Sequence, residues 1–117
     1  MAINKYKILT VVGTRPEIIR LSRCLTLFDE VFDHVLAYTN QNYDFELSKI
    51  FFRDLELRKP KYILKHKKKQ TFDILSKNLV EIQNIILKEK PDGFVVLGDT
   101  NSALTAYVAK RNKIPIF

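Results

Sequence analysis

With 117 residues, 46% of them hydrophobic and 28% charged, the chain has the length and composition of one soluble globular domain. It has no apolar run of the roughly 18 residues that a transmembrane helix needs, and its first residues lack the apolar core of a secretory signal. We therefore expect no membrane partner and a cytoplasmic location.

The net charge of +7 favours an anionic partner, and much of the excess comes from the lysine-rich segment Lys59–Lys69. A solvated loop would explain these lysines equally well. Few aromatic residues lie among them and no nucleic-acid-binding motif is present, so we expect no nucleic-acid partner. The single cysteine, Cys24, cannot form an internal disulfide and has apolar neighbours, so we expect it in or near the core.

Short apolar runs alternate along the chain with amphipathic stretches, and the runs are apolar on both faces, which is typical of parallel strands covered by helices on both sides. This alternation predicts a doubly wound, Rossmann-like α/β fold. In chain order, we expect a strand over Ile8–Val12, a helix over Pro16–Phe28, a strand over His34–Thr39, a helix over Asp44–Arg53, a short strand over Lys61–Leu64, a helix over Thr71–Lys90, a strand over Gly93–Gly98, a helix over Ser102–Arg111 and a strand over Ile114–Phe117.

The helix over Thr71–Lys90 has the clearest pattern, because apolar residues recur at steps of three and four and Pro91 follows directly. The residues expected on its buried face are Phe72, Leu75, Leu79, Ile82 and Ile86.

The turn after the first strand combines several helix-start signals. Gly13 permits a sharp turn and close approach of a ligand, Thr14 reads as an N-cap with Glu17 completing a capping box, and Pro16 suits the first helical turn. A well-made helix start would explain all of these residues except Arg15. Ligands bind at the carboxyl edge of open α/β sheets, where Arg15 and free N–H groups of the helix would suit a phosphate.

The two common nucleotide-binding fingerprints are absent from this turn. It has neither the three glycines of the dinucleotide motif nor the glycine-lysine pattern of a P-loop, which disfavours NAD and P-loop chemistry. We expect no cofactor. The two histidines have no metal-ligand spacing, so we expect no metal either.

Two further strand ends carry polar residues at the same expected edge. Asp99 and Thr100 follow Gly98, where either could simply cap the next helix or Asp99 could serve as an acid, a base or a ligand contact. Asn40 and Gln41 follow the second strand, where amides suit sugar hydroxyls but also suit an ordinary polar turn.

Four segments together resemble the N-terminal part of the non-hydrolysing UDP-N-acetylglucosamine 2-epimerase family. They read "VVGTRPEIIRLS", "NQNYDFEL", "FFRDLELRKP" and "VVLGDTNSALTAYVAKRNKIPIF", and their order and spacing agree with the family. The variants "RPEIIRLS" and "QNYD" are similar to the branch that acts on UDP-N-acetyl-6-deoxyhexosamines.

The resemblance implies a B-type glycosyltransferase-like fold of two domains, with the active site between them. It implies inversion at C2 of a UDP-N-acetylhexosamine by elimination and re-addition of UDP, without NAD or a required metal, and we expect a homo-oligomer. Asp99 matches a catalytic acidic residue, Arg15 an arginine near the diphosphate, and Arg20 stands where many members have a lysine. The residues expected to contact substrate are Gly13, Thr14, Arg15, Pro16, Gln41 and Thr100.

The chain departs from the family in its loops and its length. Asn40 replaces a common glycine, and the segment "KHKKKQT" is more basic than in relatives. The family continues past Phe117 with further acidic residues and a UDP-binding C-terminal domain. We therefore interpret residues 1–117 as one partial α/β domain that is inactive alone. The alternative is a non-catalytic domain that binds UDP-sugars or regulates another protein.

Overall fold

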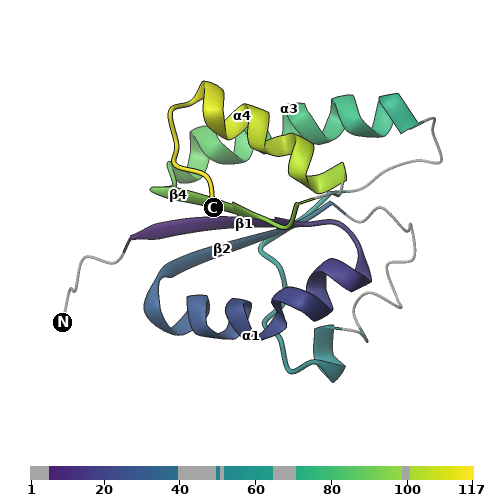
Figure 1. The fold of residues 1–117 in the computed structure, drawn as a ribbon, viewed down its shortest axis with the longest axis vertical. Coiled ribbons are helices and arrows are strands. Elements are labelled where there is room, and N and C mark those ends of the chain that lie inside the picture. The colour runs from purple at the N-terminus through teal and green to yellow at the C-terminus, as the bar shows by residue number, and fades with distance from the viewer. Residues whose placement is uncertain (1–5, 40–49, 51, 65–70, 99–100) are drawn as a thin grey trace.

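The computed structural model describes residues 6–39, 50, 52–64, 71–98 and 101–117 (Figure 1). Its centre is a four-stranded sheet in the order β3-β2-β1-β4, with every neighbouring pair parallel. The strands are β1 (Lys7–Val12), β2 (Asp33–Tyr38), β3 (Tyr62–Ile63) and β4 (Gly93–Val96).

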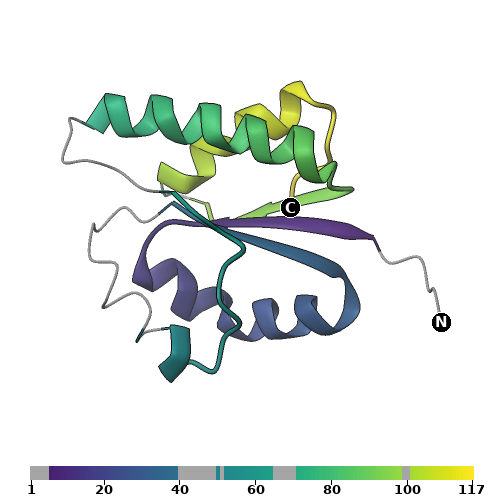
Figure 2. The ribbon, with the colours of Figure 1, turned by 180° about the vertical axis from the view of Figure 1, so that it is seen from behind.

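Helices cover both faces of this sheet, as Figures 1 and 2 show. On one face lies α1 (Arg15–Val31). On the other lie α3 (Thr71–Glu89) and a continuous helical segment made of η1 (Asn101–Thr105) and α4 (Ala106–Arg111). The doubly wound parallel α/β fold expected from the sequence is confirmed.

The side chains of the sheet alternate between two cores. Leu9 and Val11 of β1 point towards α3 and α4, where they pack with Ile82, Phe94 and Val108. On the other face of the sheet, Val12 of β1 and Leu36 and Tyr38 of β2 pack against Ile18 and Leu25 of α1 and against Phe52.

The element bounds differ from the expected ones at several ends. Helix α1 continues to Val31, three residues further than its apolar pattern indicates. Its extension is stable because the Phe32 N–H still donates to the Phe28 carbonyl at 2.9 Å. The helix expected over Asp44–Arg53 lies partly outside the described residues, although residues 50 and 52–54 are helical.

The last expected strand is reduced to a short addition on the outer edge of β4. Phe94 donates to the Pro115 carbonyl at 2.9 Å and accepts from the Phe117 N–H at 2.8 Å, in parallel pairing centred on Ile116. Lys113, with a φ of 60°, turns the chain just before this segment. Residues 115–117 therefore extend the sheet past β4.

Two expected core residues are exposed, and helix geometry explains both. Phe72 stands fourteen residues before Ile86, slightly less than four turns, so it is rotated by about 40° from the buried stripe. It is 79% exposed. Cys24 is also exposed, because its neighbour Leu25 faces the sheet and successive helical positions differ by about 100°.

No helix in the described part of the chain is both long enough and apolar enough to cross a membrane.

Candidate functional site

The carboxyl ends of three strands meet at one edge of the sheet. Val12 is in register with Tyr38, and Val11 with Val96. The Thr39 N–H donates to the Val12 carbonyl at 2.8 Å. The residues that follow these strands therefore leave the sheet at the same edge, which confirms the sequence-based expectation for Gly13, Thr39 and Gly98.

A reciprocal capping box begins α1 at this edge. The buried Glu17 carboxylate accepts from the Gly13 N–H at 3.2 Å and from the Thr14 hydroxyl at 2.8 Å, while Thr14 Oγ1 accepts from the Glu17 N–H at 3.5 Å. These contacts satisfy donors that a helix start otherwise leaves without partners. The expected capping box is confirmed.

The same contacts change the expected chemistry of the turn. The N–H groups of Gly13 and Glu17 are used within the protein, and Pro16, the second residue of the helix, has no N–H. The capping box therefore uses two of the N–H groups of this turn, and Pro16 supplies none, so fewer N–H groups face a ligand than a bare helix start would offer. Gly13 is buried and does not adopt a positive φ. A glycine is therefore not needed here for a left-handed turn, and its small size instead allows close packing.

The two arginines of this region lie on α1 but on different sides. Arg15 is the first residue of the helix instead of a loop residue, and it is half-buried. Arg20 is exposed. Five positions along an α-helix correspond to about 140° of rotation, so the two guanidinium groups leave the helix in different directions.

Three of the expected site residues, Gln41, Asp99 and Thr100, lie outside the described residues. The structure therefore brings together Gly13, Thr14, Arg15 and Pro16 at the carboxyl edge.

The sequence did not predict the burial of two polar residues on the face of the sheet that carries α3 and α4. Ser102 in η1 and Asn78 in α3 are almost fully buried, yet Ser102 Oγ and Asn78 Oδ1 have no hydrogen-bond partner among the described residues. A buried polar atom without a partner costs about 1–3 kcal/mol, so such atoms usually bind water or a ligand. The sequence signal for the burial of Asn78 was its position four residues before the core residue Ile82, because residues four apart lie on the same side of a helix.

A buried network around His34 ties β1, β2 and the end of α1 together. His34 Nε2 lies 2.7 Å from Thr10 Oγ1, and its Nδ1 lies 2.7 Å from Asp29 Oδ1. Arg58 donates to the same Asp29 oxygen at 2.9 Å and to the His34 carbonyl at 2.7 Å. Burial lowers the pKa of His34 below its ordinary 6.5, and the Asp29 carboxylate offsets only part of that effect.

A second network surrounds Glu89, at the end of α3 that lies near the start of β1. Lys61 donates to its carboxylate at 2.8 Å, Lys7 at 3.2 Å, and the Tyr62 hydroxyl also donates to it. Burial alone would raise the pKa of Glu89. Hydrogen bonds from Lys61 and Tyr62, followed by one from Lys7, outweigh burial and lower this pKa to about 2.

Neither network resembles a metal site, and no group of three or more His, Cys, Asp or Glu side chains in the described part of the chain could hold a metal ion. Both networks lie away from the turn that carries Arg15, and their groups bind one another. We assign them a structural role.

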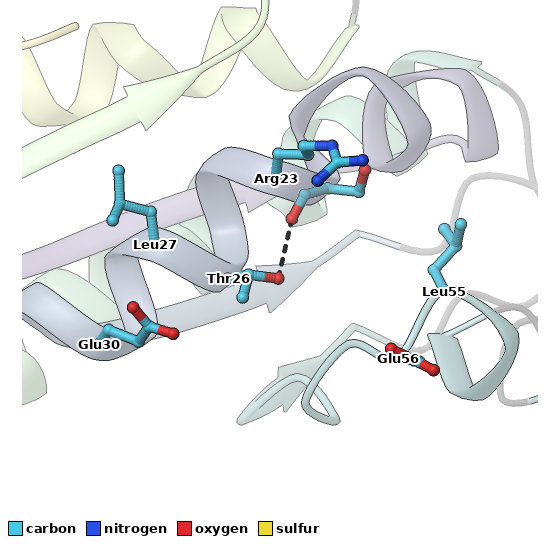
Figure 3. Close-up of a pocket in the computed structure, with 7 residues that line it drawn as sticks. Arg23, Thr26, Leu27, Glu30, Leu55 and Glu56 are labelled. Atoms are coloured by element: carbon cyan, nitrogen blue, oxygen red, sulfur yellow. Dashed lines mark hydrogen bonds between the residues drawn. The ribbon is translucent and has the colours of Figure 1, made fainter.

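Two cavities lined by described residues lie away from that turn. Figure 3 shows an open pocket of about 490 Å³ between α1 and residues 55–56, lined by side chains that include Arg23, Glu30 and Glu56. The hydroxyl groups in this pocket bond to their own helix: Ser22 to the Ile19 carbonyl and Thr26 to the Ser22 carbonyl. A second cavity of about 440 Å³ lies beneath β4 and is almost entirely apolar. The carboxyl edge, which carries an arginine at a helix start, remains the better candidate for an anionic ligand.

The sequence profile of the UDP-N-acetylglucosamine 2-epimerase family matches residues 27–117. The UDP-N-acetylglucosamine 2-epimerase of Methanocaldococcus jannaschii is 42% identical over 112 residues, which cover 94% of this chain and 31% of that protein. The UDP-2,3-diacetamido-2,3-dideoxy-D-glucuronate 2-epimerase of Pseudomonas aeruginosa is 36% identical over 113 residues, covering 94% of this chain and 32% of that enzyme.

Solved structures give the same result. The UDP-N-acetylglucosamine 2-epimerase of Rickettsia bellii superposes with a TM-score of 0.87 and 43% identity, covering 97% of this chain and 30% of that one. The M. jannaschii enzyme, solved in complex with UDP-GlcNAc and UDP, superposes with a TM-score of 0.85 over 94% of this chain and 31% of that one.

The chain thus spans about a third of the length of these relatives. The profile match extends from Leu27, near the end of α1, to the last residue, and the fold agrees with that of the N-terminal portion of the solved enzymes. The chain belongs to the UDP-N-acetylglucosamine 2-epimerase family.

Proposed function

We propose that this chain is the N-terminal portion of an enzyme that inverts C2 of a UDP-N-acetylhexosamine. The observation that carries the proposal is its likeness to the M. jannaschii epimerase, a protein solved with UDP-GlcNAc and UDP. The half-buried Arg15 at the carboxyl edge supports it, because a guanidinium group suits a diphosphate.

The reaction proceeds by elimination and re-addition. A base removes the proton from C2 while the bond between C1 and the diphosphate oxygen breaks, which releases UDP and leaves a glycal with a C1–C2 double bond. UDP then re-forms its bond to C1, and C2 receives a proton on the opposite face. Every atom of the substrate is retained, so the reaction requires no oxidant or reductant.

We assign the candidate residues as follows. Arg15 stabilises the diphosphate in the substrate and in the leaving group, and Gly13, Thr14 and Pro16 form the wall beside it. Asp99 and Arg20 take part in the chemistry, Asp99 as an acid–base group. Gln41 and Thr100 contact the substrate.

We further propose that residues 1–117 are inactive alone and that they self-associate. When joined to the rest of the active site, they act in the cytoplasm on polysaccharide precursors. Relatives are about three times as long, so most of their residues have no counterpart here. The second candidate function is a non-catalytic domain that binds UDP-sugars.

A chimera tests the enzymatic assignment. The chain replaces the matching segment of the M. jannaschii epimerase, and inversion at C2 of UDP-N-acetylglucosamine is followed by NMR in D₂O. We expect turnover by the chimera and none by residues 1–117 alone. An inactive but folded chimera that still binds UDP-GlcNAc would favour the non-catalytic function, and turnover by the isolated chain would overturn the expected inactivity.

A further inference from the structure

The two buried polar side chains on the α3 side of the sheet need a hydrogen-bond partner. Asn78 is 1% exposed and Ser102 is fully enclosed, yet Asn78 Oδ1 and Ser102 Oγ find none among the described residues. The amide oxygen can only accept a hydrogen bond, whereas the hydroxyl can both donate and accept. Burying either atom without a partner would lower the folding equilibrium constant roughly tenfold, so we expect each to bind a polar group.

Asn78 lies on the inner side of α3, level with the end of β1. It precedes the core residue Ile82 by four positions, which places both on the side of the helix that faces the sheet. At the end of the same helix, the Glu89 carboxylate accepts from Lys7, the first residue of β1, at 3.2 Å. From Glu89 back to Asn78 the helix rises about 16 Å, and β1 rises by about the same length from Lys7 to Val12. Asn78 therefore lies beneath the carboxyl edge of the sheet.

Ser102 belongs to the segment that follows β4 at this edge. Its helical turn, η1, contacts both β1 and α3, so the buried hydroxyl lies in the layer between the helices and the sheet. The Thr105 hydroxyl donates to the Ser102 carbonyl at 2.6 Å, but no described residue bonds to the Ser102 hydroxyl. The inner side of η1 therefore keeps hydrogen-bonding capacity close to the end of β1.

The surroundings favour water as the missing partner. The side chains packed in this layer are apolar and include Val11, Leu79 and Ile82. Neither of the two cavities described above is lined by Asn78 or Ser102, so a larger ligand has no evident route to them. Globular proteins hold about one buried water per 27 residues, and these waters bond to polar groups that lack protein partners.

We propose that Asn78 and Ser102 are positioning residues of the candidate site, and that buried water bound to Asn78 Oδ1 and Ser102 Oγ fixes the start of η1 against α3 and β1. The inference rests on the proposed function, because its effect on catalysis passes through Asp99, which precedes η1 by two positions. Arg15 stands on α1, on the other face of the sheet, so a shift of η1 leaves it in place. Loss of the water therefore lowers turnover more than substrate binding.

The sign of a stability change tests whether Asn78 binds water. Asn78→Leu replaces the amide by an apolar side chain of similar size. If water is bound, the leucine removes one of its partners, and we expect the unfolding equilibrium constant measured in urea to rise about tenfold. Asn84→Leu is the matched control, because Asn84 lies exposed on the same helix, and it should change this constant less than about threefold. A fall of the constant in Asn78→Leu would show that the amide has no partner at all, which would overturn the proposal.

A pair of variants with the same shape tests the hydroxyl of Ser102. Ser102→Thr and Ser102→Val introduce the same branched side chain, but only threonine keeps the hydroxyl. We expect the unfolding constant of the valine variant to exceed that of the threonine variant at least about fivefold. Amide NMR shifts of the chain should show residues 99–101 displaced by Ser102→Val and much less by Ser102→Thr. Equal unfolding constants, or equal shifts, would contradict the proposal.

Turnover of the active chimera tests positioning directly. Asn78→Leu and Ser102→Val should each lower kcat about tenfold and leave KM within about twofold, while Ser102→Thr should retain most of the activity. A tenfold rise in KM would show that these groups bind substrate, and an unchanged kcat would show that they position nothing. Either result overturns the inference. A chimera without turnover would count against the proposed function alone, because the unfolding constants and amide shifts are measured on the chain itself and still decide this inference.

Discussion

At the scale of single residues, two buried ionisable groups make this small domain sensitive to acid. Glu89 is charged and hydrogen-bonded by Lys61, Lys7 and Tyr62, whereas His34 is enclosed with a lowered pKa. Both groups bind protons less readily in the folded chain than in the unfolded chain. The free energy of unfolding therefore falls as the pH is lowered.

For Glu89 the relevant range lies between its ordinary pKa of 4.5 and its folded value of about 2. Its contribution to the unfolding free energy is fully present above pH 4.5 and is lost as the pH falls towards 2. We expect Glu89→Gln to cost on the order of 2 kcal/mol at pH 7, after allowing for solvent screening, and to flatten this part of the pH profile. Urea unfolding at several pH values measures it, with the exposed Glu56→Gln as control. An unchanged slope in Glu89→Gln would contradict the prediction.

For His34 the neighbours should move the pKa in opposite directions. The Asp29 carboxylate raises this pKa and the Arg58 guanidinium lowers it. We expect Asp29→Asn to lower the His34 pKa further and Arg58→Gln to raise it. Ring proton shifts followed by NMR give each midpoint, and shifts of the same sign in both variants would show that the network rearranges.

At the scale of elements, the start of α1 combines stability with the candidate site. Thr14 caps the helix, and the Glu17 carboxylate in turn accepts hydrogen bonds from the Gly13 N–H and the Thr14 hydroxyl. This one small motif therefore fixes the turn that carries Arg15. Loss of the cap should affect both properties.

Thr14→Ala should destabilise the fold by about 0.5–2 kcal/mol, and Thr14→Ser should restore most of that loss. Thr26 provides a control on the same helix. Its hydroxyl donates to the Ser22 carbonyl within the helix, and alanine is the better helix former, so Thr26→Ala should be neutral or stabilising. Urea unfolding compares the three variants, and equal losses at Thr14 and Thr26 would show that capping is not the cause.

The roles proposed for the candidate residues can be tested by substitution in the active chimera. Asp99→Asn should lower turnover about 100-fold or more, because an acid–base group contributes roughly 10²- to 10⁴-fold. Arg15→Ala should impair both substrate binding and turnover. Glu56→Gln, which alters none of the candidate residues, serves as the control. Full activity in Asp99→Asn would remove that residue from the mechanism.

The sequence predicted the elements well because short apolar runs and the capping residues are local signals. It predicted β1, α1 and the capping box closely, since Thr14, Pro16 and Glu17 define that start. It failed at Phe72 and Cys24, where burial depends on which side of a helix meets the sheet. It also missed the burial of Asn78 and the use of the Gly13 N–H by Glu17, which depend on tertiary packing.

At the scale of the whole molecule, the described residues leave apolar side chains exposed on the outer side of α3 and the η1–α4 segment, on the outer side of α1 and in the cavity beneath β4. The cavity is lined by Phe28, Phe32 and Phe117, among others. We expect it to bind a fluorescent apolar dye such as ANS in the folded state, because it is roomy and nearly free of polar groups.

Phe117→Ser should reduce this dye fluorescence, because it removes one apolar wall of the cavity, while Leu27→Ser should leave it nearly unchanged. Circular dichroism recorded in parallel verifies that the dye reports the folded chain. Equal loss of fluorescence in both variants would place the dye elsewhere.

The position of β1 between β2 and β4 has a consequence for folding kinetics. The β1–β2 pair joins neighbouring parts of the chain, but the β1–β4 pair joins segments as far apart as Lys7 and Asp92, 85 positions away. Closing so long a loop is entropically costly and slows the search for native contacts. During synthesis on a ribosome, the first βαβ unit, made of β1, α1 and β2, can form early. The edge of β1 that pairs with β4 then stays unpaired until β4 emerges. The nascent chain is therefore most prone to aggregation in the interval before residue 93 appears.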